Sequence, residues 1–268
     1  MKVAIIGCGN MGAACAKAMR REKLIEQQDV LLIDNDSEKV SLLEENQVGN
    51  GVAISAVSEA DVVMLAVKPQ SFGSLAEVLK GYIKSEQIIV SIMAGVSIDV
   101  IKGLLPTNKV VRAMPNTPCQ IGKGATGYYV SFEMKEAERQ FLSAMFDSTG
   151  VAVQVNNEDN VDAVTAVSGS GPAYFYYFLK HIIQSGEEMG LDASMAKTLA
   201  LQTMSGAHQL MLNHDGDIDE LISAVKSKGG TTEAALNKMI EKQVGESINE
   251  ALKTAKIRAA ELSKMLEI

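Results

Sequence analysis

The chain has 268 residues, of which 47% are apolar and 22% charged, a balance that is typical of a packed soluble protein and excludes intrinsic disorder. Its 25 Lys and Arg against 33 Asp and Glu give a net charge of −8, which argues against nucleic acid as a partner. The three cysteines are scattered, without the spacing of metal ligands, so we expect free thiols, no metal site and a cytoplasmic protein. The longest apolar runs hold about six residues where a membrane helix needs roughly twenty, so we expect no membrane span and no secretory signal.

The first half of the chain alternates short β-branched runs with segments of helical period. We expect strands at residues 3–6, 30–33, 61–67 and 87–92, and helices that begin near residues 10 and 37 and cover residues 69–82 and 97–105. Further strands at residues 109–113, 127–131 and 151–155, with a helix over residues 133–148, would complete the sheet. Continuous apolar strands separated by helices predict an α/β fold for residues 1–155, a Rossmann-like parallel sheet with helices on both faces.

Beyond residue 155 only helical patterns remain, interrupted by glycines, so residues 156–268 are predicted to form an all-α second domain. Pro172 suits the first turn of a helix, and Asp192 suits the N-cap of the next one. The last predicted helix carries an apolar stripe of Ile248, Leu252, Ala255, Ala259, Leu262 and Leu266. The stripe needs a partner, which is either another part of the same chain or a second copy.

A glycine-rich loop directly follows the first predicted strand and opens the first predicted helix. It consists of Gly7, Cys8, Gly9, Asn10, Met11 and Gly12, a Gly-x-Gly-x-x-Gly pattern. Gly7 permits a tight turn, Gly9 lets the backbone approach a pyrophosphate, and Gly12 lets the helix pack closely on the strand. In this context the pattern predicts a dinucleotide site, and a glycine-rich turn without a ligand is the alternative.

Asp34 ends the second predicted strand, where a carboxylate can accept hydrogen bonds from the adenosine ribose diol. Asp36 and Glu38 follow it, and their negative charge would repel the 2′-phosphate of NADPH. The segment therefore favours NADH. The alternative is that Asp34 and Asp36 only cap the following helix.

Four further motifs accompany the glycine loop along the chain. They are Ala66-Val67-Lys68-Pro69, Met114-Pro-Asn-Thr-Pro118, Ser168-Gly-Ser-Gly-Pro-Ala-Tyr174 and Gly229-Gly-Thr-Thr-Glu-Ala-Ala235. Together the five motifs resemble the pyrroline-5-carboxylate reductase family, over essentially the whole chain. The resemblance implies reduction of 1-pyrroline-5-carboxylate to L-proline, the last step of proline biosynthesis, with hydride from NADPH or NADH.

The resemblance also implies roles for individual residues. The glycine loop would hold the pyrophosphate, with Asp34 and Asn35 beside the adenosine ribose. The nicotinamide half would contact Val67, Lys68, Pro69 and Ala94. The substrate carboxylate would bind Ser227, Gly230, Thr231 and Thr232, and Glu158 falls near an acidic position of the substrate pocket.

Reduction of a cyclic imine needs a hydride donor, an anion site for the carboxylate and a protonated nitrogen. A basic imine can arrive already protonated, so the enzyme needs no strong general acid, and the three histidines lie outside all five motifs. We take Thr232 as the candidate catalytic residue, which would bond the imine nitrogen and orient the ring. Residues 229–232 also predict a helix start with Thr231 or Thr232 as the N-cap, which would leave amides free for a carboxylate.

The chain departs from the family pattern in three places. Asp34-Asn35 stands where many bacterial relatives have Asn-Arg, which removes the expected ligand of a 2′-phosphate. Ser227-Lys228 replaces the common Ser-Pro, and Asp217-Ile218 replaces His-Pro.

We expect the helical domain to form a homodimer or a larger assembly of dimers, in which residues 229–232 of one subunit lie over the nucleotide domain of its partner. Two other functions remain open. A β-hydroxyacid dehydrogenase-like oxidoreductase would share the glycine-rich start, but such enzymes use a lysine near the middle of the chain, and the region after Ser168 offers only Lys180. A dinucleotide-binding sensor without turnover would not need the loop at residues 229–232.

Overall fold

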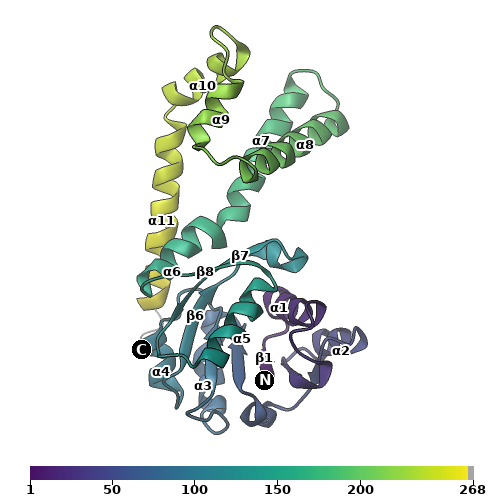
Figure 1. The fold of residues 1–268 in the computed structure, drawn as a ribbon, viewed down its shortest axis with the longest axis vertical. Coiled ribbons are helices and arrows are strands. Elements are labelled where there is room, and N and C mark those ends of the chain that lie inside the picture. Colours follow the sequence, from purple (N-terminus) through teal and green to yellow (C-terminus); the bar gives the residue numbers. More distant parts are fainter. Residues whose placement is uncertain (265–268) are drawn as a thin grey trace. The chain divides into compact units, whose positions relative to one another are not determined.

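The computed structural model describes residues 1–264, and its internal contacts divide the chain into two compact units. The first unit holds residues 1–172 together with the chain from Thr254 onward, and the second holds Ala173–Lys253. Figure 1 shows the fold, coloured along the sequence. The last strand ends at Gln154, and the division into domains at residues 1–155 and 156–268 stays a prediction.

The first unit is built on a sheet with the strand order β3-β2-β1-β4-β5-β6-β7-β8. The strands are β1 (Val3–Ile6), β2 (Val30–Ile33), β3 (Asn50–Gly51), β4 (Val62–Leu65), β5 (Ile88–Ser91), β6 (Val110–Met114), β7 (Gly124–Val130) and β8 (Gly150–Gln154). Neighbouring strands are parallel except β6 and β7. The predicted Rossmann-like sheet is thus confirmed, with one antiparallel pair that the prediction lacked. The segment between Met114 and Gly124 is shorter than the dozen or so residues that a parallel crossover needs.

Helices cover both faces of this sheet, as predicted. They are α1 (Asn10–Arg21), α2 (Ser37–Glu45), α3 (Phe72–Leu79), α4 (Ile98–Leu104) and α5 (Glu136–Asp147). Successive residues of a strand enter opposite cores, because side chains alternate across a strand. Ile5 of β1 belongs to the core that includes residues of α1 and α5, and Ile6 belongs to the core that includes residues of α3 and α4 (Figure 1). This burial on both faces explains the continuous apolar runs in the sequence.

Several predicted elements are shorter in the structure. The helix expected over residues 69–82 begins with a 3₁₀ turn at Pro69–Ser71 and continues as α3 only to Leu79. The strand expected over residues 61–67 is limited to β4, and the Asp61 carboxylate before it accepts a hydrogen bond from the Lys2 amide at 2.8 Å. The helix expected over residues 133–148 is α5.

After β8 the described chain, to residue 264, is helical. It contains α6 (Asp159–Val164), a π-helical turn (Thr165–Gly169), α7 (Gly171–Glu188), α8 (Ala193–Leu212), α9 (Ile218–Val225), α10 (Thr231–Glu241) and α11 (Val244–Lys264). Pro172 lies in the first turn of α7, and the Asp192 carboxylate caps α8 by accepting from the Met195 amide at 3.0 Å. Both positions are as predicted.

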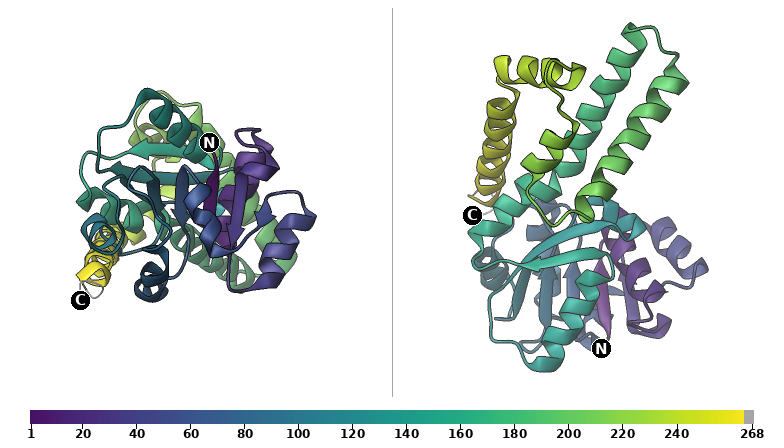
Figure 2. Two further views of the ribbon diagram at one scale, coloured as in Figure 1. Left: turned by 90° about the horizontal axis from the view of Figure 1, so that it is seen from below. Right: turned by 45° about the horizontal axis from the view of Figure 1, so that its top comes forward.

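Two long helices, α7 and α8, lie side by side and are joined by a short turn (Figure 2). The apolar stripe of α11 is partly covered within the chain, since Ala259 is buried, whereas Ile248 is exposed. Leu266 of that stripe lies outside the described residues. Within residues 1–264, no helix is long and apolar enough to cross a membrane.

Candidate functional site

The glycine loop turns sharply between β1 and α1. Gly7 has a φ of +102°, and its amide donates to the Ile33 carbonyl of the neighbouring strand at 2.8 Å. A Cβ at Gly7 would lie 2.5 Å from the Ala66 carbonyl oxygen, and one at Gly12 would collide with the Gly7 carbonyl. Both positions therefore require glycine, for the turn and for the close packing of the helix.

Gly9 is different, because a Cβ there would meet no atom of the described residues, 1–264, within 4 Å. Its backbone, with φ −70° and ψ −170°, suits any residue, so neither conformation nor crowding inside the chain explains this glycine. Gly9 is the N-cap of α1 and makes no side-chain cap, and the first hydrogen bond of the helix runs from the Ala13 amide to the Gly9 carbonyl. The amides of residues 9–12 precede this first helical hydrogen bond, so they are left for a ligand, at the positive end of a twelve-residue helix. This open cradle fits the pyrophosphate of a dinucleotide.

Asp34 ties the end of β2 to the glycine loop. One oxygen of its carboxylate accepts from the Cys8 amide at 2.6 Å, and the other accepts from the Asp36 amide at 2.9 Å. The cap of α2 is Asp36, which accepts from the Glu38 amide at 3.1 Å. The capping alternative is therefore confirmed for Asp36 and wrong for Asp34.

The charges around Asp34 are predominantly negative. Lys39 is the one cation between residues 34 and 39, and its ammonium pairs with the Asp36 carboxylate at 3.0 Å. This contact holds the pKa of Asp36 below its usual value and raises that of Lys39. Lys39 is thus already engaged, and Asn35 beside it is exposed and uncharged.

The other residues predicted to contact a cofactor lie at the same edge of the sheet. Residues 66–69 follow β4 and Ala94 follows β5, and both strands run parallel to β1. Each loop begins on the neighbouring strand, because the Ala66 amide donates to the Ile6 carbonyl at the end of β1 at 2.8 Å and the Ile92 amide donates to the Leu65 carbonyl at the end of β4 at 3.1 Å. The structure therefore brings the glycine loop, Asp34 and these two loops together where open α/β sheets bind ligands.

The segment predicted to bind substrate forms the N-terminus of α10, in the second unit. Gly230 is its N-cap, so the expected capping by Thr231 or Thr232 is wrong. The Glu233 side chain instead reaches back and accepts from the Gly229 amide at 2.7 Å. Within residues 1–264, the hydroxyls of Thr231 and Thr232 have no hydrogen-bond partner, which leaves them to a ligand.

This turn also depends on its glycines. Gly229 has a φ of +73°, and a Cβ at Gly230 would collide with the Ser227 hydroxyl. The Gly230 amide donates to the Ser227 carbonyl at 3.0 Å, which closes the turn.

Glu158 does not stand free. Its Oε1 accepts from the Ile98 amide at 2.8 Å and from the guanidinium of Arg112 at 3.2 Å. Arg112 also donates to the Asp162 carboxylate at 2.6 Å, and Arg112 and Asp162 are both buried. Arg112 and Asp162 are not among the residues predicted from the sequence. The available signal was a single arginine inside the apolar run of residues 110–114.

The cysteines near the glycine loop are buried. Cys8, Cys15 and Cys119 are buried free thiols. Burial raises the pKa of Cys8 to about 11, with a further contribution from the charge of Asp34, and burial raises that of Cys15 to about 12. Both thiols are therefore protonated at neutral pH, which argues against thiol catalysis.

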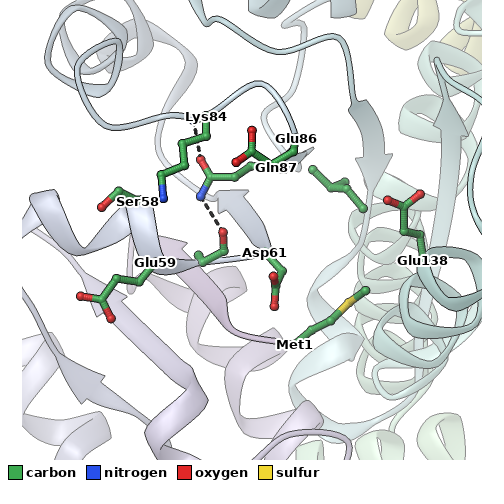
Figure 3. A pocket seen from close by; sticks show the side chains of 10 residues that line it. Met1, Ser58, Glu59, Asp61, Lys84, Glu86, Gln87 and Glu138 are labelled. Atoms are coloured by element: carbon green, nitrogen blue, oxygen red, sulfur yellow. Dashed lines mark hydrogen bonds between the residues drawn. The ribbon is translucent and has the colours of Figure 1, made fainter.

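A separate hollow of about 250 Å³ lies near the amino ends of β4 and β5 (Figure 3). Glu59, Asp61 and Glu86 are among its lining residues, and the side chain of Gln87 is fully hydrogen-bonded to neighbouring backbone. Ligands of open α/β sheets bind at the opposite, carboxyl ends of the strands. We assign no function to this hollow.

Comparison with known proteins identifies relatives over the full chain. Residues 158–262 match the family model described as pyrroline-5-carboxylate reductase dimerisation, and residues 2–95 match the model described as NADP oxidoreductase, coenzyme F420-dependent. The pyrroline-5-carboxylate reductase of Pseudomonas aeruginosa is 35% identical, with 99% of this chain and 98% of that protein covered. The chain belongs to the pyrroline-5-carboxylate reductase family.

Solved structures of pyrroline-5-carboxylate reductases have the same fold. The enzyme from Coxiella burnetii is 29% identical with a TM-score of 0.88, over 98% of both chains. The enzyme from Plasmodium falciparum, whose structure has NADP bound, is 26% identical with a TM-score of 0.87, again over 98% of both chains. The resemblance to the pyrroline-5-carboxylate reductase family is therefore confirmed.

Two motifs of this reductase family meet in the first unit. Asn116, in the motif of residues 114–118, donates to the Ser168 carbonyl at 3.0 Å and accepts from the Ala125 amide at 2.9 Å. A Cβ at Gly169 would crowd the Met114 side chain at 3.2 Å. The two motifs therefore hold the π-helical turn against the sheet.

The open space at Gly9 allows a test of cofactor binding by a single substitution. The variant Gly9→Ala should fold with an unchanged melting temperature, because its Cβ meets no atom of the chain, yet it should weaken NAD(P)H binding about tenfold or more, since the methyl group occupies the cradle. Cofactor fluorescence titration and thermal unfolding measure the two effects. Gly73→Ala, an equally open glycine in α3, is the control and should bind normally. Unchanged affinity in Gly9→Ala would contradict the assignment of the cradle.

Proposed function

We propose that this protein reduces 1-pyrroline-5-carboxylate to L-proline with NADPH or NADH as the hydride donor. Its full-length similarity to reductases of that name supports the reaction. One structural observation carries the proposal. Two glycine-rich motifs form helix starts without a side-chain cap, one at Gly9, where a Cβ would meet no neighbour within residues 1–264, and one at Gly230, followed by two threonine hydroxyls without a partner in the same range. They match the two anions that the reaction must hold, a pyrophosphate and a small carboxylate.

The residues of the first unit would hold and orient the cofactor. The amides of Gly9, Asn10 and Met11 would bind the pyrophosphate, with Gly7, Cys8 and Gly12 shaping the turn around it. Asp34 and Asn35 would lie beside the adenosine ribose, and Val67, Lys68, Pro69 and Ala94 would line the nicotinamide half. When bound, the nicotinamide supplies the hydride.

The start of α10 would hold the substrate. Gly230, whose amide closes the turn onto the Ser227 carbonyl, would shape the site, and the amides of Thr231 and Thr232 with the Ser227 hydroxyl would bind the carboxylate. The helix N-terminus favours that charge. The Thr232 hydroxyl would bond the imine nitrogen and fix the ring for attack on the imine carbon. No residue has to donate the proton, because the substrate nitrogen arrives protonated. Direct contact of Glu158 with substrate stays a prediction.

Two of the three histidines lie against neighbouring side chains. The ring of His181 packs edge-on against Tyr177, and His214 Nε2 lies 3.2 Å from the Glu220 carboxylate. The neighbouring Asp217, which replaces a histidine of the family, caps α9 by accepting from the Asp219 amide at 3.2 Å. These contacts give the side chains structural roles and support a mechanism without a histidine acid.

A turnover assay tests the function directly. The purified protein should oxidise NADH or NADPH when 1-pyrroline-5-carboxylate is added, and Thr232→Ala should lower kcat about tenfold or more with little change in the KM for cofactor. Thr232→Ser keeps the hydroxyl and should retain most of the activity. Absence of oxidation with either cofactor would favour the alternative of a sensor without turnover, and an unchanged kcat in Thr232→Ala would remove its catalytic role.

We further propose that NADH is the preferred cofactor. The 2′-phosphate of NADPH would approach Asp34, Asp36 and Glu38, and the nearby Lys39 is already paired with Asp36. Among residues 34–39, no further cation offsets the repulsion between these carboxylates and a 2′-phosphate. The match of residues 2–95 to an NADP oxidoreductase model and the NADP-bound relative leave both cofactors chemically compatible with the fold.

The preference should respond to one substitution. Asn35→Arg places a guanidinium at the exposed position after Asp34 and should raise kcat/KM for NADPH relative to NADH by about tenfold, which corresponds to about 1.4 kcal/mol. Gln28→Arg adds the same charge at an exposed position before β2, at the opposite end of the strand, and should leave the ratio unchanged. Wild-type protein that prefers NADPH, or equal effects of the two variants, would contradict the proposal.

Self-association is supported by the dimerisation-model match over residues 158–262, and we propose that the assembly is a homodimer or is built from homodimers. An apolar groove of about 540 Å³ runs between α7 and α8 of the second unit. Phe178 and Leu199 line it and are 42% and 53% exposed, and the adjacent Tyr176 and Tyr177 are also exposed. Apolar surface of this extent is typical of a contact between chains.

A charge in the groove should prevent dimer formation. Leu199→Glu would place a carboxylate in the apolar contact, so light scattering after size exclusion should show monomers where the wild type shows dimers. Gln202→Glu adds the same charge on α8 outside the groove residues and should remain dimeric. If Leu199→Glu keeps the wild-type mass, the groove is not the interface. A cytoplasmic location stays a prediction.

A further inference from the structure

Arg112 is a buried cation in an otherwise apolar strand. It lies in β6 between Val111 and Ala113, which are fully buried, and it is itself only 2% exposed. A charged side chain persists in such a place only when it is paired and hydrogen-bonded. Its partners therefore show what the charge does.

Both partners come from the start of α6. One terminal nitrogen of Arg112 donates to Asp162 at 2.6 Å, and the other donates to Glu158 at 3.2 Å. Glu158 and Asp162 are four residues apart and so face the same side of the helix. Arg112 Nε has no partner within residues 1–264, so the cation acts through its two terminal nitrogens. The guanidinium holds two carboxylates side by side that would otherwise repel each other.

Glu158 also contacts a third element, helix α4. The same Oε1 that meets Arg112 accepts from the amide of Ile98, the first residue of α4, at 2.8 Å. The loop of residues 92–97 lies between β5 and this amide, and its start is held by the hydrogen bond from the Ile92 amide to the Leu65 carbonyl. The loop is therefore anchored at both ends, by β4 at the start and by Glu158 and Arg112 at the end.

The anchored loop contains Ala94 and Gly95, whose φ is +69°. Residues 92–97 follow β5 at the carboxyl edge of the sheet, beside the loop of residues 66–69. If the function proposed above holds, this loop lines the nicotinamide half of the cofactor. A small displacement there would change the distance between the hydride donor and the imine carbon, on which the rate depends steeply.

We propose that Arg112 is a positioning residue for hydride transfer. It acts through Glu158 and the Ile98 amide to fix the loop of residues 92–97. Removal of the cation leaves the Glu158 and Asp162 carboxylates to repel each other, so Glu158 turns away and releases Ile98. In this account Glu158 acts through the backbone of the loop, and this part of the inference rests on the proposed function.

The test compares Arg112→Met with Lys109→Met. Lys109 directly precedes β6, at its amino end, and forms a partly buried pair with Glu138 at 2.7 Å, so its loss also disturbs an ion pair of the first unit but does not touch the loop. Both variants are assayed at a temperature where circular dichroism shows them folded. Arg112→Lys, which keeps the charge with one terminal nitrogen, is the second variant if Arg112→Met does not fold.

Two readouts separate positioning from simple loss of stability. In the protein without ligand, amide hydrogen exchange of residues 92–98 should be about tenfold or more faster in Arg112→Met, and less accelerated in Arg112→Lys, with no such change in Lys109→Met. In the reaction with 1-pyrroline-5-carboxylate, kcat should fall about tenfold or more and the deuterium isotope effect from labelled cofactor should increase, with substrate KM within about twofold.

The outcomes are distinguishable. Unchanged exchange at residues 92–98 in both Arg112 variants, or equal exchange and kcat losses in Lys109→Met, would overturn the positioning role. Wild-type protein that does not turn over 1-pyrroline-5-carboxylate would instead overturn the proposed function, while the exchange measurement would still decide whether Arg112 holds the loop.

Discussion

The close approach of α1 to the end of β1 is the constraint on which the rest of the nucleotide unit depends. Gly7 and Gly12 permit it, because a Cβ at either position would collide with backbone. Because α1 packs so closely on β1, the amides at the start of the helix lie at the open space over Gly9. Asp34 then fixes the loop by accepting from the Cys8 amide, and the chain after β4 packs against Gly7. The backbone geometry alone therefore creates a site that fits a pyrophosphate, without a charged side chain.

The proposed binding of two anions at helix N-termini explains why the reaction needs so few catalytic side chains. In the proposed function, the start of α1 would provide amides for a dinucleotide, and the start of α10 would provide amides and hydroxyls for a small carboxylate. Because the imine nitrogen is already protonated, the protein has two remaining tasks. It binds the pyrophosphate and the substrate carboxylate, and it fixes the distance between the hydride donor and the imine carbon. The Arg112 network belongs to that second task, because it is buried, fully inside the first unit, and connected to a loop at the ligand-binding edge.

The elements that were predicted correctly are those whose structure is determined by residues close together in the sequence. β1 and β2 have their predicted bounds because four-residue apolar runs buried on both faces admit one interpretation. The cap at Asp192 follows from its own side chain. β7 was predicted as a strand at residues 127–131, but its antiparallel direction was not, because the direction of a strand depends on the length of the connection before it. Capping by Thr231 or Thr232 was wrong because Glu233 satisfies the turn instead. The Arg112 network joins residues that are 46 and 50 positions apart, and no local pattern records it.

A crystal structure of the protein with NADH tests the central claim most directly. The account predicts that the pyrophosphate oxygens accept hydrogen bonds from amides at the start of α1, over Gly9, with the adenosine ribose beside Asp34 and the nicotinamide between residues 67–69 and Ala94. A pyrophosphate bound away from the start of α1, with the space at Gly9 still open, would contradict it.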